Sequence, residues 1–531
     1  MVFILHRYIF RELLKIFLLT TLALTLIMSL GSVLRPVQEY GVGPRQVLHL
    51  LAYFVPVALT FVLPISALFA TALVYGRFSS DNEFDACRAS GVSVSMVVYP
   101  GLFLAIIVAI ANLLLSFHVM PAFIGLAQRA VGADAKQILF RNISRAGYYS
   151  PPGGTFKISA DGVDVDSGML SGVVIVENSG DEYGRKIITA ESAKVIFGTG
   201  KKANTITVFA SNAFQMNADG GVSFTSISVL GRIDSMMKDN VEFKSSEEIN
   251  NIRNDPMYYD PIAQEAYKAY ERLTAELLFA DVNSALSKSE RAHYQLFNDE
   301  SIISFTGNDS ILRDDNAIEF SGGVELFVFD RKTEKMQHSF RGSRAILQLA
   351  DDPNKEPDSE LMMTFPNARW VDAGMEVTDS QYVVQSLRLP DNVSAKLGED
   401  VIATVREHSY LSKPSRSLEA MKNEMNRRIK VTLAEIKAEM HSRLVFGIGC
   451  IILILIGAGL GIRLKGGHLL TAFGTSAIPA AALLVFIMMG KNLTRNQAST
   501  VGPDGGIIFM WAGLGVLLVF TVWLYRKLLR T

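Results

Sequence analysis

The sequence predicts an α-helical membrane protein with six transmembrane helices, three on each side of an inserted, extracytoplasmic, β-rich domain. Three observations lead to this fold class. The chain has 531 residues, of which 49% are hydrophobic and 19% charged, which is more apolar than is usual for a soluble protein of this size. Six apolar runs are long enough, at about 1.5 Å per residue, to cross a hydrocarbon core of roughly 30 Å. A long, mostly polar stretch separates the first three runs from the last three.

The apolar runs define two membrane halves, residues 1–120 and 443–531. The runs themselves are residues 16–34, 47–75, 92–117, 444–462, 469–489 and 506–525. The opening MVFILHRYIFRELLK has no small-residue cleavage site after its apolar run, which is typical of an uncleaved signal-anchor helix whose start lies in the membrane interface.

The orientation of the spans is predicted from Lys and Arg in the short flanks. Because the number of spans is even, both termini lie on one side, and that side carries ten Lys and Arg residues: Arg7, Arg11, Lys15, Arg77, Arg88, Arg463, Lys465, Arg526, Lys527 and Arg530. The short loops of the opposite side carry four: Arg35, Arg45, Lys491 and Arg495. The side richer in these cations stays in the cytoplasm, so the inserted domain is predicted to lie outside it.

The inserted region has two β-rich blocks. Residues 121–244 contain short strand patterns punctuated by Gly, Asn and Asp, which indicate an antiparallel sandwich or roll. Residues 245–300 contain a helical pattern, interpreted either as a helix packed on the sheet or as a partner-binding helix. Strand patterns resume in residues 301–414, and residues 415–442 form a helix that leads to the fourth span. One long sheet and two separate modules both fit this pattern.

Several classes of protein are excluded by what the sequence lacks. The six runs contain no Asp, Glu, Lys or Arg, whereas ion-coupled carriers need a buried ionisable group near the middle of the membrane. No Walker A, GxSxG, HExxH or CxxC motif occurs. The sequence therefore predicts no enzyme, cofactor or metal site, and the energy for any transport must come from another polypeptide. Cys87 is predicted to lie on the cytoplasmic side and Cys450 within a span, so the two cannot form a disulfide. The net charge of −1 gives no sign of a nucleic-acid partner.

The membrane part carries signs of close helix packing. GAGLG at residues 457–461 places small residues four apart, which allows another helix to approach closely. Pro56, Pro64 and Pro479 interrupt their runs, either as packing features or as hinges of a gate. His118, at the margin of the third run, is either an interfacial residue with its polar groups satisfied or a ligand site.

The loop between the second and third runs, RFSSDNEFDACRASGVS, is unusually acidic for a connection between spans. Ser80 and Glu83 fit a capping box, and Gly91 supplies a left-handed stop, so residues 80–90 are predicted to form a short helix on the cytoplasmic face. Glu83 is interpreted either as a helix cap alone or as an exposed carboxylate that pairs with an Arg of a cytoplasmic motor subunit.

This loop resembles the coupling helix of the lipopolysaccharide-export permeases of the LptF/LptG (YjgP/YjgQ) family. HRYIFRELLK at the start of the chain and EMHSRLVFGIGCIILILIGAGLGIRLKGG at the fourth span are also similar to that family. The resemblance covers residues 1–130 and 435–531, and it extends loosely to the first β block. It implies that residues 121–244 form a periplasmic β-jellyroll-like domain, which the helical segment and the second β block enlarge.

The resemblance also implies a function in the bacterial inner membrane. Such a permease pairs with a second homologous subunit, or with itself, around a cavity that a dimeric cytoplasmic ATPase closes. The permease extracts lipopolysaccharide or a related glycolipid and passes it to a periplasmic bridge protein. Two alternatives are a membrane-anchored envelope scaffold with a β-rich binding domain, and a membrane enzyme that acts on lipid-linked sugars. The enzyme would need a carboxylate or His cluster near the outer membrane surface, which the sequence does not offer.

The resemblance gives roles to two sets of residues. Glu83, with Asp81 and Asp85 as second choices, is expected to contact the ATPase, and Arg88 supports the same helix. The phosphates of the glycolipid need cations at the external rim, and the candidates are Arg35, Arg45, Lys491 and Arg495. The alternative for each of these cations is ordinary interfacial anchoring.

Overall fold

The computed structural model describes residues 2–530, except 41–43, 134, 151–155, 166, 178–185, 200–203, 218–219, 234–239, 288–292, 308, 350–359, 373–374, 408–410, 412, 465–468 and 497–502. Contacts divide the chain into two compact units. The first unit is Met1–Arg253 together with Val431–Thr531, and the second is Asn254–Lys430. The helical segment and second β block therefore form one unit with the beginning of the helix that leads to the fourth span.

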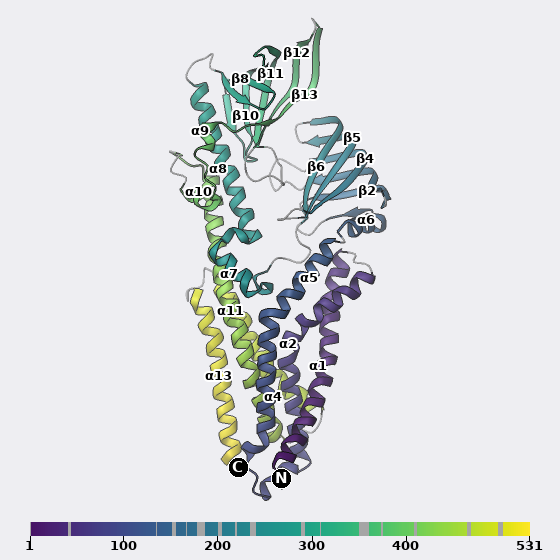
Figure 1. Ribbon diagram of the computed structural model, residues 1–531, viewed down its shortest axis with the longest axis vertical. Helices are drawn as coiled ribbons and strands as arrows, with labels where there is room; N and C mark the ends of the chain where they lie inside the picture. Colours follow the sequence, from purple (N-terminus) through teal and green to yellow (C-terminus); the bar gives the residue numbers. More distant parts are fainter. Residues whose placement is uncertain are drawn as a thin grey trace. The chain divides into compact units, whose positions relative to one another are not determined.

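Six of the described helices are long and apolar enough to cross a membrane, three before and three after the inserted region (Figure 1). They are α1 (Val2–Tyr40), α2 (Pro44–Ser80), α4 (Val94–Leu114) with its continuation, α11 (Arg416–Leu464), α12 (Leu469–Arg495) and α13 (Pro503–Arg530). The predicted arrangement of six spans is confirmed. α1 runs without interruption from the amphipathic start into the first span, and α11 includes the whole helix predicted before the fourth span.

The third membrane helix extends further than the sequence predicts. After α4 the helix widens into a π-helical turn, η1 (Leu115–Val119), and then continues as α5 (Met120–Ala133). The N–H of Met120 donates to the carbonyl of Leu115, five residues back, immediately before Pro121. Because Pro121 has no N–H to offer, a wide turn at this point lets the helix continue where a proline would otherwise end it. The amphipathic helix α6 (Ala135–Ala146) follows.

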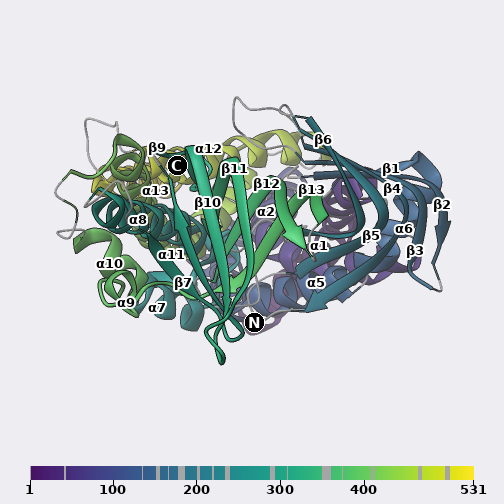
Figure 2. The same ribbon diagram turned by 90° about the horizontal axis from the view of Figure 1, so that it is seen from above.

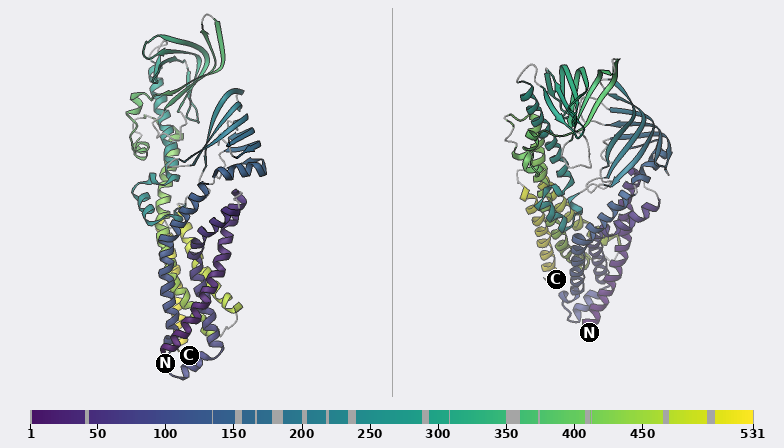
Figure 3. Two further views of the ribbon diagram at one scale, coloured as in Figure 1. Left: turned by 45° about the vertical axis from the view of Figure 1, so that its right-hand side comes forward. Right: turned by 45° about the horizontal axis from the view of Figure 1, so that its top comes forward.

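The first β block forms one antiparallel sheet (Figure 2 and Figure 3), and its consecutive strands are hydrogen-bonded neighbours. Its strands are β1 (Tyr148–Tyr149), β2 (Phe156–Asp164), β3 (Met169–Glu177), β4 (Lys186–Thr199), β5 (Asn204–Asn217) and β6 (Gly220–Ile233). Alternate side chains such as Ile158, Val173 and Val208 point into a core that includes Phe140 of α6. The predicted strands are confirmed, and the helices α5 and α6 precede them in the chain.

The second β block forms a separate sheet with the strand order β13-β12-β11-β10-β8-β7, so the blocks are two modules. Its strands are β7 (Tyr294–Phe297), β8 (Ser301–Thr306), β9 (Asp309–Leu312), β10 (Ile318–Asp330), β11 (Met336–Leu349), β12 (Leu361–Asp372) and β13 (Met375–Leu387). The main helix within the predicted helical segment, residues 245–300, is α8 (Asp260–Leu286). Residues 294–297 form the strand β7, in which burial alternates with a period of two.

α8 packs on the second sheet, which supports the first of its two interpretations. Tyr270, Leu273 and Leu277 are buried, and the helix contacts β7, β9 and β11. The remaining short elements are α3 (Glu83–Ala89), η2 (Val241–Phe243), α7 (Ser246–Asn254), η3 (Pro256–Tyr258), α9 (Asp391–Ser394) and α10 (Val401–Glu407).

The glycines of the fourth span allow α11 to pack closely against α2. A Cβ atom added at Gly457 would lie 2.6 Å from the carbonyl oxygen of Leu68, and one added at Gly461 would lie 2.6 Å from that of Ala72. Since real side chains do not fit at such distances, only glycine allows the two backbones to approach this closely. The predicted close packing at the GAGLG segment is confirmed, and it joins the N-terminal and C-terminal halves of the membrane part.

Candidate functional site: the acidic loop and the outer ends of the membrane helices

The acidic loop folds as α3, a helix of seven residues between α2 and α4. Phe84 is buried in the apolar core formed by α1, α2, α4, α11 and α13, and Cys87, one turn later, packs against the same core. Because residues three apart share a face of a helix, Phe84 and Cys87 turn one side of α3 inward. Glu83, Asp85 and Arg88 are exposed. The helix is thus fixed to the bundle by one buried ring and presents charged side chains to solvent.

The predicted capping box at the start of this helix is not formed. The N-cap residue is Asn82, which has a left-handed backbone (φ 58°) and makes no side-chain cap. The Ser80 hydroxyl donates instead to the carbonyl of Arg77 at 3.0 Å and to the carboxylate of Asp81 at 3.3 Å. The left-handed turn at Asn82 separates α2 from α3, so α3 is shorter than predicted. The interpretation of Glu83 as a helix cap is wrong.

The end of α3 follows the prediction. Gly91 adopts a left-handed backbone (φ 82°), the region in which glycine pays no steric cost. The N–H of Gly91 donates to the carbonyl of Arg88 at 2.9 Å, and the N–H of Val92 donates to that of Cys87 at 3.0 Å. These bonds satisfy carbonyls that the helix leaves free and turn the chain into α4.

The base of the loop is tied to three other helices. The Ser79 hydroxyl donates to the carbonyl of Ile462 in α11 at 2.8 Å, in a buried position. The Tyr75 hydroxyl donates to the carbonyl of Val97 in α4 at 3.0 Å, and the Nε2 atom of His6 in α1 lies 2.8 Å from the Met96 carbonyl oxygen. A force applied to α3 therefore acts on an end of the bundle that hydrogen bonds between helices hold together.

The electrostatics of the loop are those of an exposed surface. Arg77 and Asp81 form an ion pair at 3.7 Å, with both side chains more than half exposed. Partial burial, and then the negative charge of Glu83, raise the pKa of the Cys87 thiol above its usual value. Cys450 is fully buried within α11.

The four rim cations differ in their surroundings. Arg35 and Arg45 lie in α1 and α2, but their side chains are outside the described residues. Lys491 and Arg495 both lie at the end of α12. The Nε atom of Arg495 lies 2.9 Å from a carboxylate oxygen of Glu435. Lys491 and Arg495, the two candidates whose side chains the structure describes, both have carboxylate partners.

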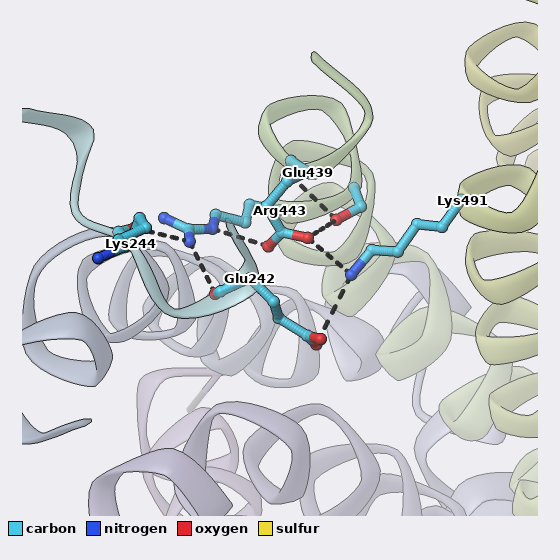
Figure 4. Close-up of polar contacts among 6 residues, drawn as sticks. Glu242, Lys244, Glu439, Arg443 and Lys491 are labelled. Carbon is cyan, nitrogen blue, oxygen red and sulfur yellow. Dashed lines mark hydrogen bonds and ion pairs between the residues drawn. The ribbon is translucent and has the colours of Figure 1, made fainter. Parts of the chain in front are cut away.

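Lys491 belongs to a partly buried cluster of charged side chains that the sequence did not reveal (Figure 4). Its Nζ atom lies 2.7 Å from Oε2 of Glu439 and 3.7 Å from Oε1 of Glu242. The Nε atom of Arg443 donates to Oε1 of Glu439 at 3.0 Å, and its Nη2 atom donates to the main-chain carbonyls of Glu242 and Lys244, each at 3.0 Å. Glu439 and Arg443 are each less than one-tenth exposed.

One part of this cluster had a signal in the sequence. Glu439 and Arg443 are four residues apart on a helix, immediately before an apolar run, a spacing that favours an ion pair. No sequence pattern indicated Glu242 as a member of the cluster, because it is distant in the chain from Glu439, Arg443 and Lys491 and lies in a 3₁₀ turn. Among the described residues, no group of three or more His, Cys, Asp or Glu side chains is placed to hold a metal ion.

The structure has two groups of three membrane helices around a β-rich insertion, and a charged helix is fixed at one membrane end. These features define a multi-pass permease-type membrane protein. The family model of the lipopolysaccharide export system permease LptF/LptG matches residues 7–527, and the chain belongs to that family. No curated protein sequence matches the chain. The chain is therefore an inner-membrane permease of the lipopolysaccharide export system, a transmembrane subunit whose ATPase is a separate polypeptide. This membership sets aside the scaffold and enzyme alternatives.

Proposed function

We propose that this permease extracts lipopolysaccharide or a related glycolipid from the inner membrane, driven by a cytoplasmic ATPase dimer that docks on α3. It works beside a second homologous permease, or a second copy of itself, and passes the lipid to a periplasmic β-jellyroll bridge protein. One observation carries the proposal. α3 is anchored by Phe84 and exposes Glu83, Asp81, Asp85 and Arg88.

The geometry of α3 supports a role in docking rather than in capping. Glu83 makes no capping contact, so its carboxylate is available to an Arg of the motor subunit. A charged pair at the edge of an interface contributes orientation and specificity more than affinity. Since the end of α2 leads into the loop that forms α3, and Tyr75 and Ser79 bond that end to α4 and α11, movement of the motor subunit would reach the membrane helices through this contact.

The apolar helix faces and the rim cations support a lipid cargo. α1 exposes Leu19, Leu22 and Leu30, and α12 exposes Ile478 and Met488. A lipid with several acyl chains needs such apolar surfaces rather than a polar pore. Lys491 and Arg495 at the end of α12, with Arg35 and Arg45 at the ends of α1 and α2, are the cations proposed to receive its phosphates.

The docking proposal is tested by reversing the charge of Glu83. Glu83→Arg is expected to abolish transport and to reduce the amount of co-purified ATPase about tenfold or more, while the protein still inserts in the membrane. Phe84→Ala should have a similar effect because α3 loses its anchor. Glu12→Ala, at an acidic residue near the start of α1, is the control and should change neither quantity. Full transport in Glu83→Arg would contradict the proposal.

Cys87 provides a second readout in the unmodified loop. A membrane-impermeant maleimide is expected to label Cys87 only from the cytoplasmic side, and Cys450 is too buried to react. Labelling should fall when the ATPase is bound, because the docked subunit would cover α3. Equal labelling with and without the ATPase would place the docking surface elsewhere.

A further inference from the structure

The charged cluster around Glu439 of α11 and Lys491 of α12 holds its two carboxylates unequally. We name the four side chains Glu242, Glu439, Arg443 and Lys491 the rim cluster. Glu439 is 7% exposed and contacts both cations at hydrogen-bonding distance, at 3.0 Å to Arg443 and 2.7 Å to Lys491. Glu242 is 43% exposed and lies 3.7 Å from Lys491. One carboxylate is thus an integral part of the cluster, and the other contacts it loosely from the solvent side.

The charges of the cluster explain why a second anion is present. The single carboxylate of Glu439 is shared between two cations, so Glu439, Arg443 and Lys491 together carry one excess positive charge. Burying an unbalanced charge is costly, and an anion beside Lys491 reduces that cost. Lys491 is 29% exposed, so this anion can come from solvent as well as from the protein. Glu242 supplies it in the structure.

The side chain of Glu242 can leave without disturbing its own turn. Arg443 holds η2 through the main-chain carbonyls of Glu242 and Lys244, neither of which depends on the Glu242 carboxylate. The guanidinium also lies over the ring of Phe117, 5.4 Å from its centroid. Beside Lys491, the backbone of α12 lies close to α13, since a Cβ atom at the preceding residue, Gly490, would lie 2.6 Å from the Gly506 carbonyl oxygen.

We propose that Glu242 is an internal competitor that occupies an anion site on Lys491, and that a phosphate group of the transported glycolipid displaces it. This inference rests on the proposed function and adds to it a built-in competitor at one of the rim cations. A phosphate oxygen accepts the same charge-assisted hydrogen bond from an ammonium group as a carboxylate oxygen does. One negative charge of a phosphate balances the single excess positive charge of the cluster, as the Glu242 carboxylate does, and a mobile phosphate can approach the ammonium group more closely than the 3.7 Å at which Glu242 lies.

The site is tested by binding of bis-phosphorylated lipid A to the full chain in nanodiscs. Glu242→Gln keeps the turn but removes the competing charge, so binding is expected to tighten on the order of two- to fivefold, the factor that corresponds to an exposed ion pair. Dephosphorylated lipid A should bind the variant and the wild type equally. The tighter binding should be absent from the double variant Glu242→Gln with Lys491→Gln. It should persist in the double variant Glu242→Gln with Lys491→Arg.

Glu248→Gln is the matched control. Glu248 pairs with Lys244 at 3.6 Å, is 37% exposed, and makes no contact with Lys491 in the described structure. This variant should bind bis-phosphorylated lipid A as the wild type does. Unchanged binding in Glu242→Gln, or the same gain in Glu248→Gln, would overturn the inference and leave the proposed function intact.

Two further outcomes distinguish a lipid phosphate from free phosphate, and a failure of this inference from a failure of the proposed function. Inorganic phosphate is titrated as a competitor and should displace the lipid only weakly, because it lacks the acyl chains. Complete displacement at low millimolar phosphate would assign the site to free phosphate and overturn the inference. If the wild type binds neither form of lipid A, the proposed function fails together with the inference.

Discussion

At the scale of single residues, a buried asparagine compensates for a proline within the second span. Pro64 has no N–H, so the carbonyl of Thr60, four residues earlier in α2, has no partner within its own helix. The Nδ2 group of Asn112 in α4 donates to that carbonyl, and both residues are buried. An unpaired carbonyl inside a helix bundle is costly, so this bond explains how α2 keeps a proline in its interior.

We predict that Asn112→Leu destabilises the membrane part. The variant leaves the Thr60 carbonyl buried without a donor, and the expected loss is about 1–3 kcal/mol. It is measured as a lower midpoint of unfolding in detergent. Thr60→Val is the control, because it removes only the hydroxyl that donates to Pro56 and keeps the carbonyl that Asn112 contacts. A wild-type midpoint in Asn112→Leu would show that α2 satisfies this carbonyl in another way.

At the scale of elements, α8 is fixed to the second unit by a buried ion pair. The Nε atom of Arg272 donates to Glu276 at 3.0 Å, with both side chains less than one-tenth exposed. Arg272 also donates to the carbonyl of Arg313 at 2.7 Å, and the carboxylate of Glu276 accepts from the N–H of Ser415 at 3.1 Å. The pair therefore connects α8 to the loop before β10 and to the residue that precedes α11.

We predict that Glu276→Leu strongly destabilises this unit. The variant leaves a buried guanidinium without its carboxylate, and breaking such a pair costs about 3–5 kcal/mol. The combined variant Arg272→Met with Glu276→Leu should lose much less, since no charge remains unpaired. Proteolysis within residues 254–430 measures the effect in the full chain. Lys268→Ala breaks an exposed pair with Glu265 and should leave the proteolysis rate unchanged.

The elements that the sequence predicted well are those with long, regular patterns. The six apolar runs and the alternating strands of both sheets were recognised because each pattern repeats over many residues. The short strands β7 and β9 were missed, because four residues give too little periodicity. The continuation of α4 through η1 was also missed, since Pro121 ordinarily marks a helix boundary and the π-helical turn that accommodates it has no sequence signature.

The candidate site was predictable only where its residues are close in the chain. Residues 77–93 were identified as one segment, although the capping box was wrong because Asn82 adopts a left-handed turn that Ser80 and Glu83 do not reveal. The rim cluster combines residues from η2, α11 and α12 that lie far apart in the sequence. Such a pairing depends on the tertiary fold, so Lys491 was recognised as a cation but not as a partner of Glu242 and Glu439.

At the scale of the first unit as a whole, α2 connects the acidic loop to the first β sheet. One end of α2 continues into the loop that forms α3, and the buried Ser79 at that end is bonded to α11. Near the other end, Leu50 lies in the same apolar core as Ile158 and Val208 of the sheet, and Val33 of α1 joins that core. A displacement of α3 would therefore reach the sheet through one continuous helix, without passing through the rim cluster.

We predict that Leu50→Ala separates docking from transport. Removing the side chain leaves a cavity between α2 and the sheet, at a cost of about 2–5 kcal/mol, so the sheet should follow α2 less closely. The ATPase should still co-purify, because α3 is unchanged, while glycolipid export falls. Export is measured in cells and co-purification in detergent. Leu48→Ala, at an exposed position of the same helix, should change neither. If Leu50→Ala exports at the wild-type rate, the contact between α2 and the sheet is not part of the route by which motor movement reaches the lipid.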